Sequence, residues 1–472
     1  MQNIKFGTDG WRGIIGSDFT FDNVRIVAQA IADYIKPQTA NHKPQTVVVG
    51  YDTRFLSAEF AKAIAEVLAG NGIKVLLATH PTPTPLISFT IKDRKLTAGV
   101  IVTASHNPPR YNGIKFKANY GGPADPSITG KIEALLGRNK IKILPLGKGL
   151  KTKLIQTPDL NSRYMGFIKK YLDMNLLKKK KYRILVDVMH GVGDKYIARL
   201  FEKTNIKVDT IHADADPSFA GIAPEPIEKN LQELIRRTKK GKYDIGLAVD
   251  GDADRIGVVR PDGRFVSSGE IIALLTIHFY EDKKWRGEIA KTISSTSLIE
   301  KVAQNYNLKL HETPVGFKYI CKLMLTNKIL VGGEESGGIG FKNYPPERDG
   351  MVAGLLLVEM MAHRKKGIMK IMDEMEKKYK RHHYMRDDAA YPDNLKKKLF
   401  AKLARHPLKE LMGIKVVQTK TYDGCKFIAE DGSWILFRLS GTEPILRIYV
   451  EAFTEKRLNA LMKFGKKYAF SV

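Results

Sequence analysis

Cysteine is scarce, because the 472 residues include only Cys321 and Cys425, and neither stands in a metal-ligand spacing. A disulfide framework is therefore not expected, and both are interpreted as reduced core thiols. Long apolar runs are lacking too: the longest, at 352–362, is interrupted by Glu359 and is shorter than the roughly 20 residues that span a bilayer. The first ten residues show no basic-then-apolar signal pattern. We expect a cytoplasmic protein with no membrane partner.

Acidic residues are few beside basic ones, at 50 Asp and Glu against 78 Lys and Arg, which gives a formal net charge of +28. Such an excess is typical of proteins that bind nucleic acid. Here the lysines form short separate runs, at 178–181, 236–242 and 396–398, without interleaved aromatic residues. A solvated basic exterior is the favoured interpretation, with no nucleic-acid partner. The positive field would attract an anionic, phosphorylated substrate.

One order of elements recurs three times along the chain: an apolar strand, a polar or glycine loop, a helix and another strand. The copies begin with predicted strands at 46–50, 183–188 and 289–293. Strands that alternate with helices predict α/β units with mixed or mostly parallel sheets. The last part of the chain instead predicts shorter strands and a terminal helix from Thr454, which is typical of a smaller α+β domain.

In each copy the chemically unusual loop follows the last strand. These loops are 103–108 (Thr-Ala-Ser-His-Asn-Pro), 250–255 (Asp-Gly-Asp-Ala-Asp-Arg) and 332–338 (Gly-Gly-Glu-Glu-Ser-Gly-Gly). Ligands of open α/β sheets bind outside the carboxyl ends of the strands. The sequence therefore predicts one binding loop from each of three units.

The loop with Asp250, Asp252 and Asp254 is the most informative. Three carboxylates at alternate positions suit a small hard cation, and Mg²⁺ prefers such oxygen ligands. A solvated acidic turn and a calcium loop are the alternatives, and the calcium loop is weakened because its bidentate glutamate is missing. We predict a metal site.

The other loops are weaker taken singly. Ser105 is interpreted as a nucleophile or as an ordinary turn serine, and the adjacent His106 is badly placed to take its proton. Glu334 and Ser336 offer acceptors for sugar hydroxyls or form a tight polar turn. Arg438, Ser440, Gly441 and Thr442 resemble a phosphate cradle or a β-turn. The glycine-flanked Arg12 is open to the same two interpretations.

Together these loops resemble those of the α-D-phosphohexomutase family, over essentially the whole chain and in the same order. The resemblance implies four domains around a central cleft: three similar α/β units with mixed or parallel sheets, then a smaller α+β domain. We place them at 1–151 (phosphoserine loop), 152–262 (metal loop), 263–378 (sugar-binding loop) and 379–472 (phosphate-binding loop).

The resemblance also implies roles for particular residues. Ser105 is similar to the serine that carries the phosphoryl group. Asp250, Asp252 and Asp254 are similar to the ligands of one Mg²⁺ per site, with a phosphoserine oxygen as the fourth. The other implied catalytic residues are Arg12, His106 and Lys115, the last as the proton-handling group. The implied substrate contacts are Arg255, Lys318, Glu334, Ser336, Arg348, Arg438, Ser440, Gly441 and Thr442.

The implied reaction interconverts hexose 1-phosphate and hexose 6-phosphate through a hexose 1,6-bisphosphate, which is both intermediate and activator. The run from Glu334 to Gly338 resembles glucose-type mutases, so glucose is the expected hexose, in a monomer or homodimer. Phosphomannomutase and phosphoglucosamine mutase activities are the alternatives by the same mechanism. A metal-dependent phosphatase and a non-catalytic carbohydrate-binding relative are the alternatives from other classes.

Overall fold

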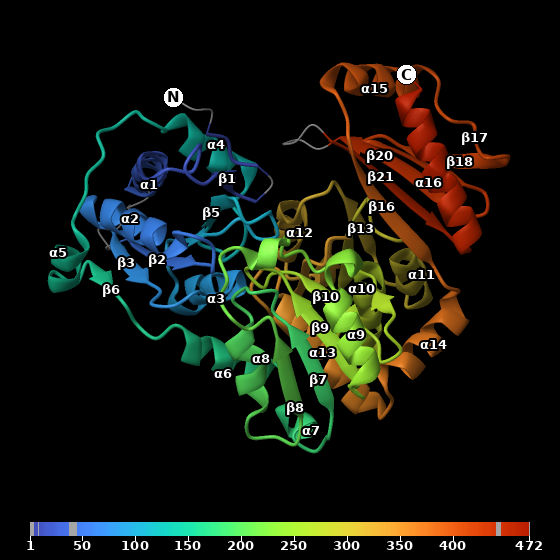
Figure 1. Ribbon diagram of the computed structural model, residues 1–472, viewed down its shortest axis with the longest axis horizontal. Coiled ribbons are helices and arrows are strands. Elements are labelled where there is room, and N and C mark those ends of the chain that lie inside the picture. The colour runs from blue at the N-terminus through green and yellow to red at the C-terminus, as the bar shows by residue number, and fades with distance from the viewer. Residues whose placement is uncertain (1–3, 8, 37–44, 440–444, 472) are drawn as a thin grey trace.

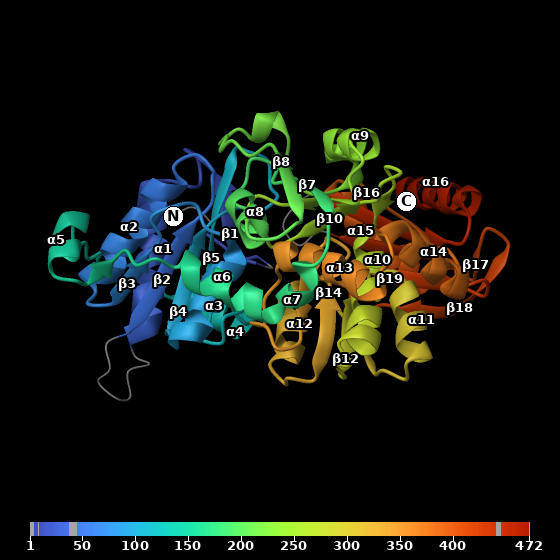
Figure 2. The same ribbon diagram turned by 90° about the horizontal axis from the view of Figure 1, so that it is seen from below.

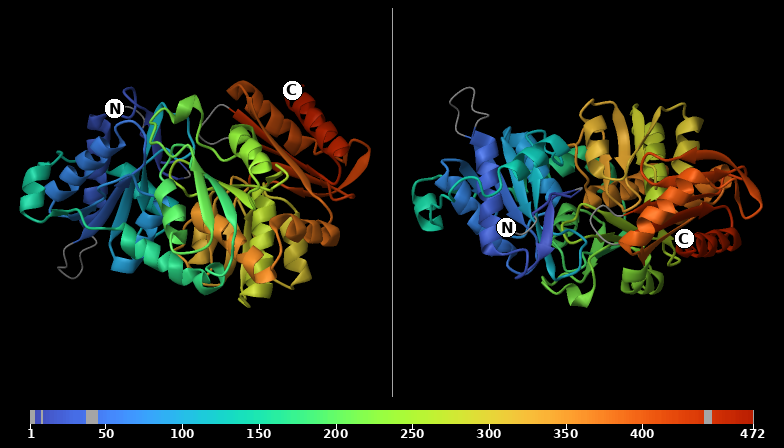
Figure 3. Two further views of the ribbon diagram at one scale, coloured as in Figure 1. Left: turned by 60° about the horizontal axis from the view of Figure 1, so that its bottom comes forward. Right: turned by 90° about the horizontal axis from the view of Figure 1, so that it is seen from above.

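The computed structural model describes residues 4–7, 9–36, 45–439 and 445–471. Within them the strands form four sheets, each with its own helices (Figure 1). We call these parts the first (11–156), second (161–266), third (268–379) and fourth (383–470) units. The first and fourth units lie at opposite ends, and the second and third lie between them (Figures 2 and 3).

The first unit has the sheet order β1-β5-β4-β2-β3-β6. Strands β2, β3, β4 and β6 run parallel to their neighbours among themselves, whereas β5 is antiparallel to β4 and to β1. The elements are β1 Trp11–Ile14, α1 Phe21–Ile35, β2 Thr46–Tyr51, α2 Ser57–Gly70, β3 Lys74–Leu77, α3 Thr84–Arg94, β4 Ala98–Val102, β5 Tyr111–Lys117, α4 Pro126–Ala134, α5 Leu146–Lys151 and β6 Ile155–Gln156.

The second unit has the order β11-β10-β9-β7-β8, with β7 parallel to β8 and β9, and β10 antiparallel to β9. Its elements are α6 Asn161–Tyr171, α7 Met174–Leu177, β7 Arg183–Asp187, α8 Asp194–Phe201, β8 Lys207–Ile211, α9 Gln232–Lys240, β9 Ile245–Val249, β10 Ile256–Val259 and β11 Phe265–Val266.

The third unit has the order β13-β12-β14-β15, again with a parallel centre and an antiparallel last strand. Its elements are α10 Ser268–Ile277, β12 Glu288–Thr292, α11 Leu298–Asn305, β13 Leu310–Thr313, α12 Phe317–Met324, β14 Ile329–Gly333, β15 Ile339–Phe341, α13 Gly350–Arg364 and α14 Ile368–Tyr379.

The fourth unit is an antiparallel sheet, β16-β21-β20-β19-β18-β17, with two helices. Its elements are β16 His383–Ala390, α15 Asp393–Arg405, β17 Glu410–Leu411, β18 Ile414–Lys420, β19 Cys425–Ala429, β20 Trp434–Leu439, β21 Ile445–Ala452 and α16 Glu455–Phe470. The predicted fold class, three α/β units and a smaller α+β domain, is confirmed. The domain boundaries at 151, 262 and 378 stay predictions. Strand β6 lies just after the boundary at 151 but pairs with β3 of the first sheet, and β11 lies just after the boundary at 262 but pairs with β10 of the second sheet.

The three predicted binding loops share one position in this repeat. Each connects the last parallel strand to an antiparallel neighbour: β4 to β5, β9 to β10, and β14 to β15. The pairing resumes directly beyond the loop, as Val249 faces Ile256 and Gly333 faces Ile339. Both ends of each loop are therefore held in register by the sheet.

Helix α13 joins the third unit to the second. Its residues from Gly350 to Ala362 are buried, and it packs against β9 and β10. Its first amide, that of Gly350, donates to the Ala253 carbonyl of the metal loop at 3.1 Å. The largest cluster of buried apolar side chains runs through the first three units, whereas most of those of the fourth unit form a cluster of their own, and Ile293 packs with Trp434, Leu436 and Tyr449 where the third and fourth units meet. No helix in the described residues is long and apolar enough to cross a membrane.

Replacing Gly350 by alanine should destabilise the protein. A Cβ there would overlap the backbone carbonyl of Arg255, which cannot move without moving the metal loop. We expect a loss of about 1–3 kcal/mol in the free energy of unfolding, measured by chemical denaturation.

Gly367→Ala is the matched control, because Gly367 precedes the neighbouring helix α14 and a Cβ there meets nothing within 4 Å. Equal stability of the two variants would contradict the close packing of α13 on the metal loop.

Candidate active site

The three binding loops meet at one place. The Ser105 hydroxyl donates to Asp250 Oδ2 at 2.7 Å, which joins the first unit to the second. The amide of Ile256 donates to the Gly337 carbonyl at 3.1 Å, which joins the second to the third. The structure thus brings together loops that lie more than 75 residues apart in the chain, as expected for the carboxyl ends of strands.

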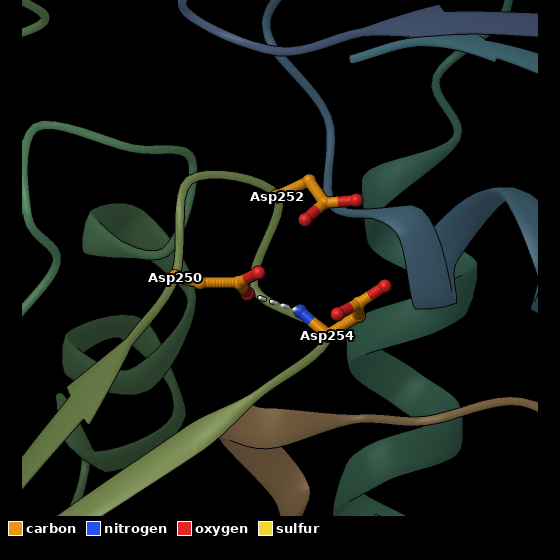
Figure 4. Close-up of side chains that lie close together, drawn as sticks. All are labelled: Asp250, Asp252 and Asp254. Atoms are coloured by element: carbon orange, nitrogen blue, oxygen red, sulfur yellow. Dashed lines mark hydrogen bonds between the residues drawn. The ribbon is translucent and has the colours of Figure 1, made fainter. Parts of the chain in front are cut away.

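The three aspartates are entirely buried, at 0% exposure each. One oxygen from each lies within 4.8 Å of the others, and Figure 4 shows the carboxylates turned toward one another. Asp250 Oδ1 accepts the amides of Asp254 (2.9 Å) and Arg255 (3.0 Å), which curls the loop around its first residue. Among the described residues this is the one cluster of at least three such ligands.

The trio fits a bound cation. The Oδ1 atoms of Asp252 and Asp254 are buried and have no hydrogen-bond partner, which is costly for a carboxylate. Burial, followed by repulsion from Asp252 and Asp254, raises the pKa of Asp250 well above its usual range. Oxygen donors at this density are the ligands that small hard cations prefer.

Lys115, which belongs to the first unit, partly neutralises the negative charge of the three aspartates. Its Nζ lies 2.7 Å from Asp252 Oδ2, 2.9 Å from Asp254 Oδ2 and 3.0 Å from Asp9 Oδ2. Burial alone would lower the pKa of Lys115, but these carboxylates outweigh it and raise the pKa above its ordinary value. The side chain is thus held as an ammonium, and its proton-handling role stays a prediction.

Arg348 connects the second unit, the third unit and the segment before β1 through one guanidinium. It reaches Asp254 Oδ2 of the second unit at 2.7 Å, Asp9 near the N-terminus, and Glu334 Oε2 of its own unit at 3.6 Å. Lys117 and Asp9 continue this network to the buried Glu347. Arg348, which the family resemblance predicts to be a substrate contact, is therefore also a central ion-pair partner within the site.

Ser105 lies in the left-handed region of the backbone, at φ 52°, and is 1% exposed. His106 Nδ1 is 3.4 Å from its hydroxyl oxygen, but the hydroxyl donates to Asp250. Burial, followed by the charges of Arg255 and Arg12, lowers the pKa of His106 well below its usual range, so the imidazole is neutral at pH 7.

The two arginines predicted near the reacting phosphate flank this loop. Arg12 donates to the side-chain oxygen of Asn107. Arg255 Nε lies 3.9 Å from both Asp250 and Asp254, and its Nη1 lies 3.7 Å from Glu225. Both cations are therefore close to Ser105 and the trio.

The predicted sugar-binding loop lies beside the trio. Burial raises the pKa of Glu334 to about 7, with repulsion from Glu335 and Asp254 adding to this and Arg348 opposing it. Ser336 is partly exposed in the same turn. Lys318, on α12, lines a small hollow together with Asp9, so it lies at the margin of the site.

The predicted phosphate cradle is only partly described. Arg438 is on β20 of the fourth unit, where its Nε donates to both oxygens of Asp423 at 3.0 Å. It has no described contact with the trio. Ser440, Gly441 and Thr442 lie outside the described residues.

Sequence reasoning missed several groups in the site. Asp9 bridges Lys115 and Arg348, Thr84 donates its hydroxyl to Asp252, and Arg386 of the fourth unit lies 3.9 Å from Glu225. Arg54 binds the backbone of the serine loop. Arg54 follows β2 at the carboxyl edge of the first sheet, where ligands of such sheets bind. This position was the one sequence signal that could have identified Arg54 as part of the site.

Comparison with known proteins agrees with this geometry. Models of the phosphoglucomutase/phosphomannomutase family match all four parts: α/β/α domain I at residues 3–142, domain II at 162–263, domain III at 267–379 and the C-terminal domain at 395–464. The chain belongs to this family. The resemblance drawn from the loops is confirmed, and so is the prediction of a mutase-type enzyme.

Known proteins match this chain over almost its full length. A Thermococcus kodakarensis protein named phosphoglucomutase/phosphomannomutase is 31% identical, over 98% of this chain and 97% of its own. A Sulfurisphaera tokodaii phosphoglucosamine/phosphogalactosamine mutase is 30% identical over 98% of each chain. The crystal structure of a Thermus thermophilus protein described as a phosphomannomutase is 34% identical, with a TM-score of 0.86 over 98% of each chain. The relatives carry the names of different hexoses.

Asp250→Asn should separate cation binding from folding. The amide keeps the shape of the Asp250 carboxylate but removes one of three buried acidic groups. Burial and repulsion raise the pKa of the Asp250 carboxyl, so its ionised form is disfavoured. In chelator the variant should be more stable than wild type at pH 7, because burial and repulsion from the other two aspartates penalise the ionised carboxylate. Mg²⁺ should raise the Tm of wild type, by the equivalent of about 2.7 kcal/mol at 100 times Kd, and leave the variant unchanged.

The control is Asp214→Asn, which removes an exposed aspartate from the same unit. A Mg²⁺-dependent rise in Tm that persists in Asp250→Asn, measured by differential scanning calorimetry, would place the cation elsewhere.

Proposed function

We propose that the protein interconverts hexose 1-phosphate and hexose 6-phosphate, with glucose as the hexose, and that Ser105 carries the phosphoryl group. The observation that carries this proposal is the Ser105 hydroxyl on Asp250, at 2.7 Å, beside two buried carboxylate oxygens without partners. A hydroxyl nucleophile next to an incomplete cation site is the arrangement that phosphoryl transfer requires.

The cation proposed for the site is a single Mg²⁺ held by Asp250, Asp252 and Asp254, with Ser105 supplying a phosphate oxygen once it is phosphorylated. When bound, such an ion neutralises the negative charge that develops on the transferring phosphoryl group. Arg12 and Arg255 lie close enough to the serine loop to share this task. Positioning and charge stabilisation are the main contributions that enzymes make to phosphoryl transfer.

The proposed reaction has two transfers. In the first, the bond between phosphorus and Ser105 Oγ breaks, and a bond forms to the free hydroxyl of the hexose monophosphate. Because Lys115 is held as an ammonium, it takes up the hydroxyl proton only as it passes one of its own protons to a carboxylate partner, so it acts as a relay and stays an ammonium. The resulting bisphosphate turns over in the site, and its other phosphoryl group then returns to Ser105. Hexose 1,6-bisphosphate is thus both the intermediate and the activator that rephosphorylates the protein.

Both orientations of the bisphosphate need the same contacts. We assign the sugar hydroxyls to Glu334 and Ser336, and the distal phosphate to Arg438 with Ser440, Gly441 and Thr442. Arg348 and Lys318 are the further substrate contacts. The guanidinium of Arg348 already forms ion pairs with Asp9 and Asp254. It can therefore bind the substrate only if it keeps these ion pairs at the same time or gives one of them up.

Glucose is proposed because the run from Glu334 to Gly338 resembles glucose-type mutases, and because relatives include a Komagataeibacter xylinus phosphoglucomutase at 29% identity. Relatives named for mannose and glucosamine phosphates make these two hexoses the competing substrates. A cytoplasmic location and a monomeric or homodimeric state stay predictions.

The first test is Ser105→Ala in a coupled assay of glucose 1-phosphate conversion, with Mg²⁺ and a trace of glucose 1,6-bisphosphate. Activity should fall on the order of 10⁴-fold or more, because the nucleophile is lost. Ser162→Ala, an exposed serine at the start of α6, is the control.

Turnover of mannose or glucosamine phosphates, but not of glucose phosphates, would replace the hexose and keep the mechanism. Release of free phosphate without isomer would identify a phosphatase, and activity retained in Ser105→Ala would remove the serine from the mechanism.

Substrate binding should depend on pH through Glu334. Because burial raises the pKa of this carboxyl to about 7, it is protonated below pH 7 and accepts fewer hydrogen bonds from sugar hydroxyls. The KM for glucose 1-phosphate should therefore fall as the pH rises through about 7. In Glu334→Gln the remaining pH dependence should be that of the substrate phosphate alone, and identical profiles would exclude Glu334 as the titrating group.

A further inference from the structure

The guanidinium of Arg54 is wholly committed to one loop. Its side chain is 0% exposed, and it follows β2 in the first unit. Nη2 donates to the carbonyls of Ser105 (2.7 Å) and Asn107 (2.6 Å), and Nη1 donates to those of Pro108 and Tyr111 (3.0 Å each). An arginine has five N–H donors, so four of them bind the backbone that carries Ser105.

The fifth donor fixes Arg54 itself. Its Nε donates to Asp52 Oδ2 at 3.1 Å, and Asp52 Oδ1 accepts the Arg54 amide at 3.0 Å and the Ser57 hydroxyl at 2.7 Å. Ser57 in turn accepts from the Asn112 side chain at 2.9 Å, on the strand beyond the serine loop. The guanidinium is thus held at a defined place between β2 and β5.

The loop needs such support because its backbone is not in a relaxed conformation. Ser105 has a φ of 52°, a region that non-glycine residues seldom adopt and that costs free energy. The chain leaves the sheet after Val102, where β4 ends, and returns to it at Tyr111, where β5 begins. The four carbonyls bound by Arg54 span this interval.

The second unit packs against the same assembly. The ring of Phe219 lies over the Arg54 guanidinium, with its centroid 4.9 Å away. Gly251 of the metal loop lies so close to the Ser105 carbonyl that a Cβ there would be 2.9 Å from it. A displacement of the serine loop would therefore change the distance between the Ser105 hydroxyl and Asp250 directly.

We propose that Arg54 is a positioning residue for phosphoryl transfer: its fork holds the Ser105 backbone so that the hydroxyl faces the aspartate trio. This inference rests on the proposed role of Ser105 as phosphoryl carrier. Lysine cannot replace it, because one ammonium has three donors from a single nitrogen and cannot span four carbonyls on two sides.

The test compares Arg54→Ala and Arg54→Lys with wild type in the mutase assay. A misplacement of about 1 Å can cost about 100-fold in rate, so kcat should fall about 100-fold in Arg54→Ala while KM for the hexose phosphate changes little. Arg54→Lys should stay well below wild type despite its charge. The extent of Ser105 phosphorylation by glucose 1,6-bisphosphate, followed by intact mass, should fall in parallel.

Arg110→Ala is the matched control, because Arg110 is an exposed arginine of the same loop that stacks on Tyr111. Its kcat should equal that of wild type. A wild-type kcat in Arg54→Lys or Arg54→Ala would overturn the proposal, as would global unfolding of both variants, since that would mean a general structural role.

Hydrogen exchange of the amides at 103–111 separates this inference from the proposed function. Exchange there should be faster in Arg54→Lys than in Arg110→Ala, whatever the wild-type activity. If wild type proves inactive on every hexose phosphate, the proposed function fails, and faster exchange would still show that Arg54 holds the loop. If wild type is active and exchange and kcat are unchanged in Arg54→Lys, only the positioning role fails.

Discussion

Three carboxylates buried in one six-residue loop are the constraint on which the rest of the site depends. A buried carboxylate costs several kcal/mol unless it is paired and hydrogen-bonded. Lys115, Arg348, Thr84 and backbone amides meet part of this need, yet two carboxylate oxygens stay without partners. The loop is thus incompletely neutralised by protein groups, which suits a site for a divalent cation.

The groups that compensate these charges come from different sheets. Lys115 lies on β5 of the first unit and Arg348 directly precedes α13 of the third, while the aspartates belong to the second. Correct packing of three units is therefore a condition for burying the trio, and the trio in turn attracts cations from its neighbours. The same logic extends to Arg54, which supports the serine loop within the first unit while its guanidinium contacts Phe219 of the second. Assembly and chemistry thus share one set of contacts.

Much of the architecture could be predicted because its signals are local. The apolar strands such as β9 are continuous runs, and the loops after them break the pattern with glycines and charges. The antiparallel strands β5, β10 and β15 were not predicted, although they close each loop into the sheet. Strands β10 and β15 are short, all three carry a glycine, and β5 also carries buried lysines, so their hydropathy pattern differs from that of the parallel core. Strand β16, with three charged residues, was missed for a similar reason.

The sequence by itself determined the repeat, the order of the loops and the types of side chain that each loop presents, because these follow from neighbours along the chain. Only the tertiary structure decided which of them meet. Asp9 and Arg348 are 339 residues apart in the chain and still form an ion pair beside the trio. Arg54 belongs to no recognisable sequence motif. Its proposed positioning role depends on the four backbone carbonyls that the fold places around its guanidinium. Electrostatic and hydrogen-bond partners depend on distances across the fold, and no local pattern contains those distances.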